Sequence, residues 1–168
     1  MSNTAPFLTP YRVLEELKRL NISHIVWLPD TESRFLYDAM VAEPSLEVIP
    51  VCREGEAIPI AMGLMLGGQR PVCMIQSTGF YESGDAVRGL ALDVKLPLLL
   101  LIGYRGWKRE GPIVDSAATF LEPVLDAWGI NRYLVETDDD VPKISQAYRE
   151  AQEKSMPVAV LRGAEYQQ

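Results

Sequence analysis

The sequence has little histidine and little cysteine, which removes several common kinds of catalytic centre. His24 is the only histidine, and Cys52 and Cys73 are the only cysteines, among 168 residues. A Ser-His-Asp triad, a Cys-His pair or a histidine-based metal site therefore has few residues from which to form. His24 directly precedes an apolar run, which favours packing at a strand end. Both cysteines lie in apolar segments, which favours core packing in a reducing cytosol.

Positive charge and long apolar runs are also scarce. Lysine and arginine number 16 against 23 aspartates and glutamates, which gives a net charge of −7. Nucleic acids and anionic membranes reward clustered lysine and arginine, so we expect neither as a partner. No run reaches the roughly 18 apolar residues that span a bilayer, and the first ten residues lack the pattern of a signal peptide. We therefore expect a cytoplasmic protein.

Apolar residues make up 48% of the chain and alternate between two kinds of pattern. Short runs rich in leucine and β-branched residues alternate with helical patterns, which is typical of βαβ units. We expect one domain, 1–168, of α/β class: a three-layer, doubly wound sheet of about six mostly parallel strands with helices on both faces. The predicted strands are 24–28, 47–51, 72–76, 98–102, 131–135 and 157–161. The predicted helices are 10–20, 32–43, 56–67, 83–94, 116–128 and 140–154.

The turn after the second predicted strand contains two acidic residues, Glu54 and Glu56. Pro59 helps to place the helix that follows, because the first four helical positions have no intrahelical bond for a proline to break. This predicts a helix start at or near Glu56. Glu54 then lies in the turn, at the sheet edge where ligands of doubly wound folds bind.

The helix predicted after this turn has no polar face over residues 57–66. An outer helix of a small α/β domain normally exposes a polar stripe to water. The simplest explanation for the missing polar face is that another subunit covers this helix. Gly63 would let a helix of that subunit approach closely. A helix sunk in a groove of its own sheet is the alternative.

Two further segments follow predicted strands. The turn 76–85 is rich in glycine and hydroxyl groups, which suits close approach to a small ligand. It lacks a dinucleotide fingerprint or phosphate loop, which argues against a flavodoxin-like nucleotide binder. Alternatively, Ser83 simply caps the next helix. The long loop 103–115 contains Arg105, our candidate cation for an anionic substrate, with loop ordering as the alternative role.

Several segments, taken in order, carry a family resemblance. They are Arg53-Glu54-Gly55-Glu56-Ala57, Ala61-Met62-Gly63, Gly67-Gly68-Gln69-Arg70-Pro71, Gln76-Ser77-Thr78-Gly79 and Pro97-Leu98-Leu99-Leu100-Leu101-Ile102-Gly103-Tyr104-Arg105-Gly106. The chain resembles the pyrimidine-binding (PYR) domain of thiamine-diphosphate enzymes from Asn21 through the sixth strand. It is most similar to the branch of sulfopyruvate decarboxylase alpha subunits and phosphonopyruvate decarboxylase.

The resemblance implies a cofactor and roles for particular residues. In that family the glutamate opening the first segment contacts the cofactor's aminopyrimidine, which makes Glu54 the catalytic residue, with Glu56 as second choice. It also implies that the residues binding the cofactor are Glu54, Gln76, Ser77, Thr78 and Gly79. The family's diphosphate-binding domain holds magnesium through Gly-Asp-Gly and a later asparagine. This chain has only Gly84-Asp85-Ala86, so it should supply no metal ligand.

The implied function is that of an alpha-type subunit of a 2-oxo acid decarboxylase. Thiamine diphosphate and Mg²⁺ would be held mainly by a beta-type partner subunit in a hetero-oligomer in which PYR domains also pair. The alternative is a non-catalytic binding or regulatory module that keeps this fold and interface. Two departures bear on the substrate: Tyr81 and Glu82 stand where relatives have asparagine or glycine, and residues 111–115 lack the relatives' histidine.

Overall fold

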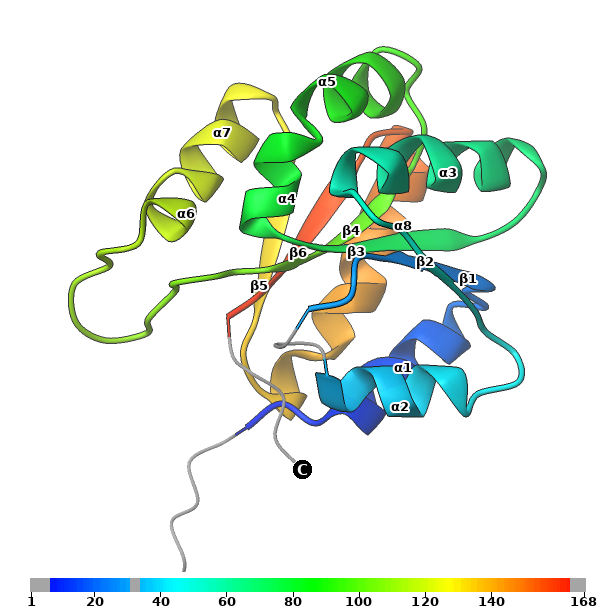
Figure 1. Ribbon diagram of the computed structural model, residues 1–168, viewed down its shortest axis with the longest axis horizontal. Coiled ribbons are helices and arrows are strands. Elements are labelled where there is room, and N and C mark those ends of the chain that lie inside the picture. Colours follow the sequence, from blue (N-terminus) through cyan, green and yellow to red (C-terminus); the bar gives the residue numbers. More distant parts are fainter. Residues whose placement is uncertain (1–6, 31–33, 164–168) are drawn as a thin grey trace, which may run out of the picture.

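The computed structural model describes residues 7–30 and 34–163, which form one sheet with helices on both faces (Figure 1). All neighbouring strands pair in parallel, in the order β2-β1-β3-β4-β6-β5. The doubly wound α/β fold predicted from the alternating pattern is therefore confirmed. The strands are β1 (His24–Trp27), β2 (Glu47–Pro50), β3 (Pro71–Gln76), β4 (Leu99–Gly103), β5 (Arg132–Val135) and β6 (Val158–Arg162).

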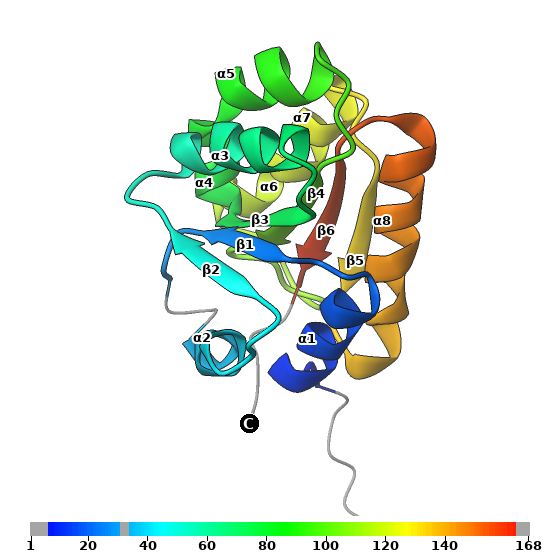
Figure 2. The same cartoon turned by 90° about the vertical axis from the view of Figure 1, so that its right-hand side faces the viewer.

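The helices divide between the two faces of the sheet (Figures 1 and 2). One face carries α1 (Pro10–Arg19), α2 (Arg34–Val41) and α8 (Pro142–Lys154). The other carries α3 (Glu54–Leu66), α4 (Ser77–Glu82), α5 (Gly84–Ala86), the π-helix η1 (Val87–Leu92), α6 (Ser116–Thr119) and α7 (Leu121–Ala127). A short 3₁₀ turn, η2 (Asp138–Asp140), precedes α8.

Side chains alternate along each central strand between two hydrophobic cores, because successive residues of a strand point to opposite faces. On β3, Val72 and Met74 join the core under α1, α2 and α8, whereas Cys73 and Ile75 join the core under α3 and α7. Strand β4 repeats the pattern and is buried along its whole length. The continuous apolar runs in the sequence thus reflect strands that are covered on both faces.

The predicted helices need two corrections on the α3 face. The helix predicted at 83–94 is α5 followed by a π-helical segment, and the one predicted at 116–128 is divided at Phe120 into α6 and α7. Residues 77–82, predicted to be an irregular turn, form the short helix α4. Gly79 is required within this helix because the position lies against Glu54 of α3 and has no room for a side chain.

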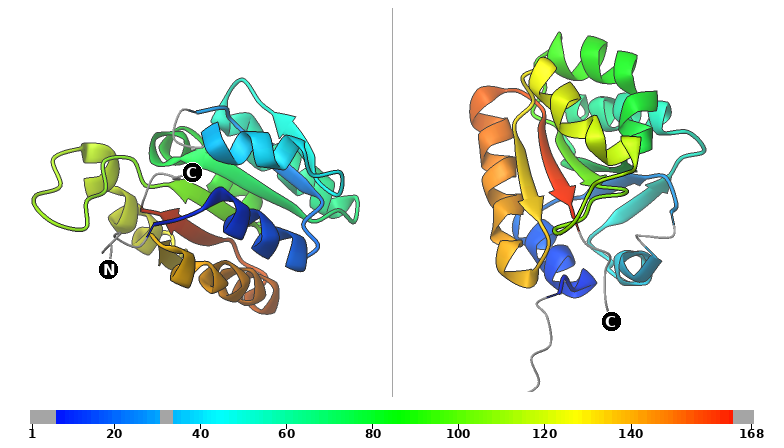
Figure 3. Two further views of the ribbon diagram at one scale, coloured as in Figure 1. Left: turned by 90° about the horizontal axis from the view of Figure 1, so that it is seen from below. Right: turned by 90° about the vertical axis from the view of Figure 1, so that its left-hand side faces the viewer.

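The winding of the chain fixes where a ligand site can lie. Helix α2, after β1, packs below the sheet, whereas α4, after β3, packs above it (Figure 1). The connections therefore diverge between β1 and β3, and such switch points open a crevice at the carboxyl ends of the strands. The loop 104–115, after β4, projects beyond the sheet at the same edge, as the view from below shows (Figure 3).

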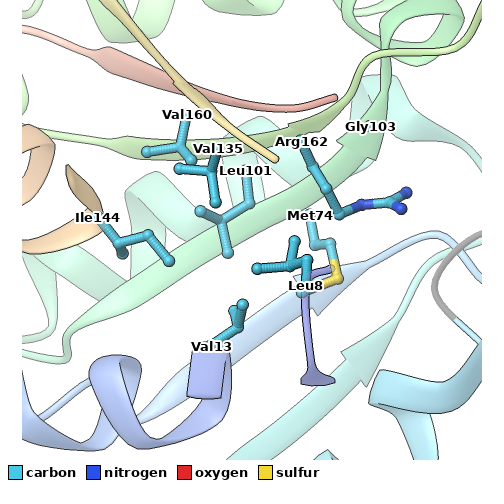
Figure 4. Close-up of a pocket in the computed structure, with 9 residues that line it drawn as sticks. All are labelled: Leu8, Val13, Met74, Leu101, Gly103, Val135, Ile144, Val160 and Arg162. Carbon is cyan, nitrogen blue, oxygen red and sulfur yellow. The ribbon is translucent and has the colours of Figure 1, made fainter. Parts of the chain in front are cut away.

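A cavity of about 20 Å³ lies between the sheet, α1 and α8. Its lining is almost entirely aliphatic, and the side chains of Val13, Leu101 and Val160 surround it while the Arg162 guanidinium points away (Figure 4). A water molecule there would lack the two to four polar partners that buried water requires. The cavity is therefore a packing defect with room for one methyl group.

Val13→Ile should fill this cavity and raise the free energy of unfolding by about 0.8 kcal/mol, the value of one buried methylene. The matched control is Val72→Ile on β3, which is fully buried and does not line the cavity. There the added methylene has no space and should destabilise by about 1 kcal/mol or more. Urea unfolding of both variants checks the difference, and equal effects would show that the cavity is not available.

Candidate active site at the carboxyl edge of the sheet

Glu54 is the first residue of α3 and lies just beyond the carboxyl end of β2. The prediction that this helix begins near Glu56, with Glu54 in the preceding turn, is wrong by two residues. Pro59 therefore lies in the helix interior, where it cannot donate a hydrogen bond to the Gly55 carbonyl. Arg53, in extended conformation, is the N-cap residue, so the glutamate side chain leaves the first helical turn at the ligand-binding edge.

The Glu54 side chain lies directly over the α-carbon of Gly79, on α4. A β-carbon on residue 79 would lie 2.3 Å from Cγ and 2.6 Å from Cδ and Oε1 of Glu54. Any larger residue at this position would displace the carboxyl group. Glu54 and Gly79, separated by 25 positions in sequence, are thus brought into contact by the parallel pairing of the sheet and by the packing of α3 on α4.

The other predicted cofactor residues follow β3 directly. Gln76 ends β3, and Ser77 begins α4 with its side chain fully buried. The Ser77 hydroxyl has no hydrogen-bond partner among the described residues. Thr78 is exposed and turns away from α3 toward the loop after β4, where it lines a pocket. These residues therefore divide between two sides of α4.

Ser83 and Glu82 make hydrogen bonds that the sequence does not predict. The Ser83 hydroxyl donates to the Gly79 carbonyl at 2.7 Å and caps no helix, so the capping interpretation is wrong. The Glu82 carboxylate reaches across to α3, where it accepts hydrogen bonds from the Gly55 N–H and the Arg53 guanidinium. No local sequence signal marks this contact, because its partners are 27 and 29 residues away.

Arg105 follows β4 and forms an ion pair with Asp115, with 3.6 Å between Nε and Oδ2. Asp115 also caps α6, since its Oδ1 accepts the Ala117 N–H at 2.9 Å. Gly106 makes the close return of the loop possible, because its φ is +79° and a β-carbon there would lie 2.4 Å from Cβ of Asp115. The loop is thus ordered around Asp115, which fits the alternative role left open for Arg105.

A surface pocket of about 490 Å³ opens between α4, α6 and α7. It is lined by Thr78, Tyr81, Arg105, Asp115, Ser116, Ala117, Phe120 and Val124. The Tyr81 hydroxyl donates to the Ala117 carbonyl at 2.9 Å, and burial together with the Asp115 charge raises the pKa of this phenol. Thr78 and Arg105, predicted separately to contact the cofactor and the substrate, meet in this pocket.

The histidine and the two cysteines lie outside this pocket. His24 starts β1, at the opposite edge of the sheet, with Nδ1 2.8 Å from the Ser23 hydroxyl and Nε2 3.4 Å from Glu47. Cys73 is buried, as expected, and contacts the Ala57 carbonyl. Cys52 is exposed, so the expectation of core packing is wrong for it. It lies beyond the end of the edge strand β2, where the described residues leave it exposed.

The described part of the chain contains no group of three or more histidine, cysteine, aspartate or glutamate side chains placed to hold a metal ion. Asp85, from the Gly84-Asp85-Ala86 segment, instead pairs with Arg88 at 2.8 Å on the surface. In the same residues, 7–30 and 34–163, no helix has both the length and the apolar character needed to cross a membrane.

Comparison with known proteins decides the family. Residues 11–136 match the model of the thiamine pyrophosphate enzyme N-terminal TPP binding domain. The chain belongs to this family. The family predicted from the segments around Glu54 and Gly79 is therefore confirmed.

Three similar proteins agree with this assignment. The sulfopyruvate decarboxylase subunit alpha of Methanocaldococcus jannaschii is 30% identical over 156 residues, covering 92% of this chain and 92% of that protein. The subunit alpha of Methanococcus maripaludis is 25% identical over 150 residues, covering 86% and 88%. The sulfopyruvate decarboxylase of Methanosarcina acetivorans is 28% identical over 147 residues, covering 87% of this chain and 38% of the relative. The predicted likeness to alpha subunits of this branch is confirmed.

A solved structure supports the fold alone. A Mycobacterium smegmatis protein assigned to the thiamin diphosphate-dependent enzymes superposes with a TM-score of 0.70 at 20% identity. The match covers 95% of this chain and 32% of that one. A domain of this length thus corresponds to about a third of the larger protein.

The two thiols should differ sharply in reactivity in the folded chain. Cys52 is exposed and should react quickly with a thiol reagent, whereas burial shields Cys73 and raises the pKa of its thiol. We expect one thiol to titrate in buffer and both to titrate in denaturant. Cys52→Ser is the control and should leave no fast thiol. Fast reaction of both thiols in the native wild-type chain would contradict the buried position of Cys73.

Proposed function

We propose that this chain is the alpha-type subunit of a thiamine-diphosphate-dependent 2-oxo acid decarboxylase, and that Glu54 is its catalytic residue. One observation carries the proposal: the Glu54 carboxylate lies at the carboxyl edge of β2 and rests on Gly79, beside the switch point of the sheet. Membership of the family and the likeness to alpha subunits support it.

The residues present fit the aminopyrimidine half of the cofactor. Gly79 leaves the space that a side chain would fill, and this space is occupied by the carbon chain of Glu54. The fully buried Ser77 hydroxyl, unpartnered among the described residues, supplies a further polar group at the start of α4. We assign Glu54, Gln76, Ser77 and Gly79 to the wall that would hold the ring. Thr78, on the other side of α4, would face the pocket that contains Arg105.

The cofactor, when bound, supplies the electron sink for loss of carbon dioxide from a 2-oxo acid. This chain would contribute a fixed carboxyl group and the proton that it shares with the cofactor. Glu54 would share a proton with a ring nitrogen of the aminopyrimidine, and the contact with Gly79 fixes where its carboxyl group lies. Groups held in place before reaction contribute much of an enzyme's acceleration, because no reorganisation is then needed.

Arg105 is our candidate for binding the acidic end of the substrate. Its guanidinium lines the pocket with Thr78 but is already paired with Asp115 at 3.6 Å. An anionic substrate group would therefore share or replace this carboxylate. Arginine can do so because its guanidinium offers five N–H donors in a fixed fork.

The diphosphate and Mg²⁺ would be held mainly by a beta-type partner. We infer the place of contact from the outer face of α3. Ala57, Ile58, Ala61 and Met62 are buried against the sheet, whereas Leu66 is 75% exposed. The exposed surface of this helix beyond its first turn is apolar, which is costly to leave in water. A partner subunit, including a paired PYR domain, would cover it.

The identity of the catalytic acid can be tested in the assembled enzyme. The chain alone should give negligible turnover, and mixing with a diphosphate-domain subunit, thiamine diphosphate and Mg²⁺ should restore decarboxylation of sulfopyruvate. Glu54→Gln should then lower kcat by at least about a hundredfold, the usual scale for a lost proton-transfer group. Glu56→Gln, two residues along the same helix, is the matched control and should stay within a few-fold of wild type.

Activity of Glu54→Gln within a few-fold of wild type would remove Glu54 from the mechanism. A large loss in Glu56→Gln alone would move the role to that residue. A partner that assembles with this chain but gives no cofactor-dependent reaction with any 2-oxo acid would favour the non-catalytic module instead.

The interface can be tested at Gly63, where a β-carbon would have no atom within 4 Å. Gly63→Gln should stabilise the lone chain by about 0.5–1 kcal/mol, because glycine is a poor helix former. The same change should block assembly with the partner, seen as loss of the heteromeric peak in size-exclusion chromatography. Gln146→Arg on the exposed face of α8 is the control and should change neither. Normal assembly of Gly63→Gln would place the interface elsewhere.

A further inference from the structure

Glu82 joins α4 to the first turn of α3, on both sides of Glu54. One carboxylate oxygen accepts the Gly55 N–H, and the other accepts the Arg53 guanidinium. Gly55 is the residue after Glu54, and Arg53 is the residue before it. A single side chain from another helix thus holds both chain neighbours of Glu54.

The contact takes the place of an ordinary helix cap. The first amides of a helix have no intrahelical acceptor and are usually satisfied by the side chain of the N-cap residue. Here the N-cap residue is Arg53, and its side chain makes no such bond. Glu82 supplies the missing acceptor to Gly55, so the geometry of the first turn of α3 depends on α4.

The same face of α4 also carries Gly79, because residues three apart lie on one side of a helix. Gly79 lies beneath the Glu54 side chain, and Glu82 lies against Gly55, where a β-carbon would be 2.9 Å from its carboxylate. The two contacts interlock the helices: α4 supports Glu54 through Gly79 and holds its backbone through Glu82.

The ion pair between Arg53 and Glu82 adds little to fold stability. The side chains of Arg53 and Glu82 are 71% and 29% exposed, and ion pairs so open to water stabilise folds little. What the contact does fix is the direction of the α3 first turn.

We propose that Glu82 is a positioning residue that orients Glu54 toward the cofactor by holding the first turn of α3. This inference rests on the proposed function of Glu54. It assigns to Glu82 a role in the geometry of α3.

The test compares Glu82→Ala with Glu82→Gln. Alanine removes both contacts, whereas glutamine keeps an oxygen that can accept the Gly55 N–H. Asp85→Ala is the matched control, since it removes a nearby carboxylate from a surface pair with Arg88. Each variant is measured for amide hydrogen exchange at Gly55 in the full chain. In the assembled enzyme, each is measured for melting temperature, thiamine diphosphate affinity and sulfopyruvate turnover.

Glu82→Ala should speed exchange at Gly55 and lower kcat by about tenfold to a hundredfold, the scale of a small displacement of a catalytic group. Cofactor affinity should change little, and the melting temperature should fall only by the few degrees expected for a lost helix cap. A loss of kcat without a loss of assembled, cofactor-bound enzyme separates positioning from a structural role. Glu82→Gln should recover most of kcat, and Asp85→Ala should match wild type.

Unchanged kcat in Glu82→Ala would overturn the proposal, as would a loss equal in Glu82→Gln and Glu82→Ala. If turnover survives Glu54→Gln, the proposed function itself fails. Exchange at Gly55 still tests the hold on the helix in that case, and a rate unaffected by Glu82→Ala would overturn it as well.

Discussion

The absence of a side chain at Gly79 is the constraint on which the site depends. Glu54 and Gly79 follow different strands, and only the parallel pairing of β1 with both β2 and β3 brings the beginnings of α3 and α4 together. The carbon chain of the glutamate occupies the space that a β-carbon would fill. A carboxylate at the end of a strand can usually rotate freely in water. The Glu54 side chain is instead confined on one side by the backbone of Gly79.

Charge at this edge is arranged in pairs. Arg53 is held by Glu82, Arg105 by Asp115 and, farther along the same loop, Arg109 by Glu136 at 3.1 Å. The pairs of Arg53 and Arg105 are exposed enough that each contributes little to the free energy of folding. Their effect is on shape, because they order the first turn of α3 and the loop after β4. Both segments border the pocket or the glutamate that we assign to catalysis.

The sheet and the family could be predicted from the sequence because they depend on signals that are local. Each central strand is covered on both faces, so its apolar run is continuous and easy to recognise. Glu54 could be proposed as the catalytic residue because its neighbours Ala57, Ala61 and Gly63 resemble the family pattern.

The details of the site depend on contacts between distant segments, and these the sequence did not reveal. The sequence misplaces the start of α3 because the acceptor for the Gly55 N–H comes from Glu82, on another helix. The helix α4 was read as a turn because its glycine and hydroxyl residues are typical of turns, although Gly79 is needed for packing. The apolar neighbours of Cys52 predict a core position, but Cys52 follows an edge strand and is exposed among the described residues.

The most direct test of this account is a crystal structure of the chain assembled with its partner subunit, thiamine diphosphate and Mg²⁺. The account predicts a Glu54 carboxylate oxygen within hydrogen-bonding distance, about 2.6–3.2 Å, of an aminopyrimidine ring nitrogen, with the side chain still lying over Gly79. A structure in which Glu54 faces solvent, or in which Glu56 or Glu82 occupies the place beside the ring, would contradict it.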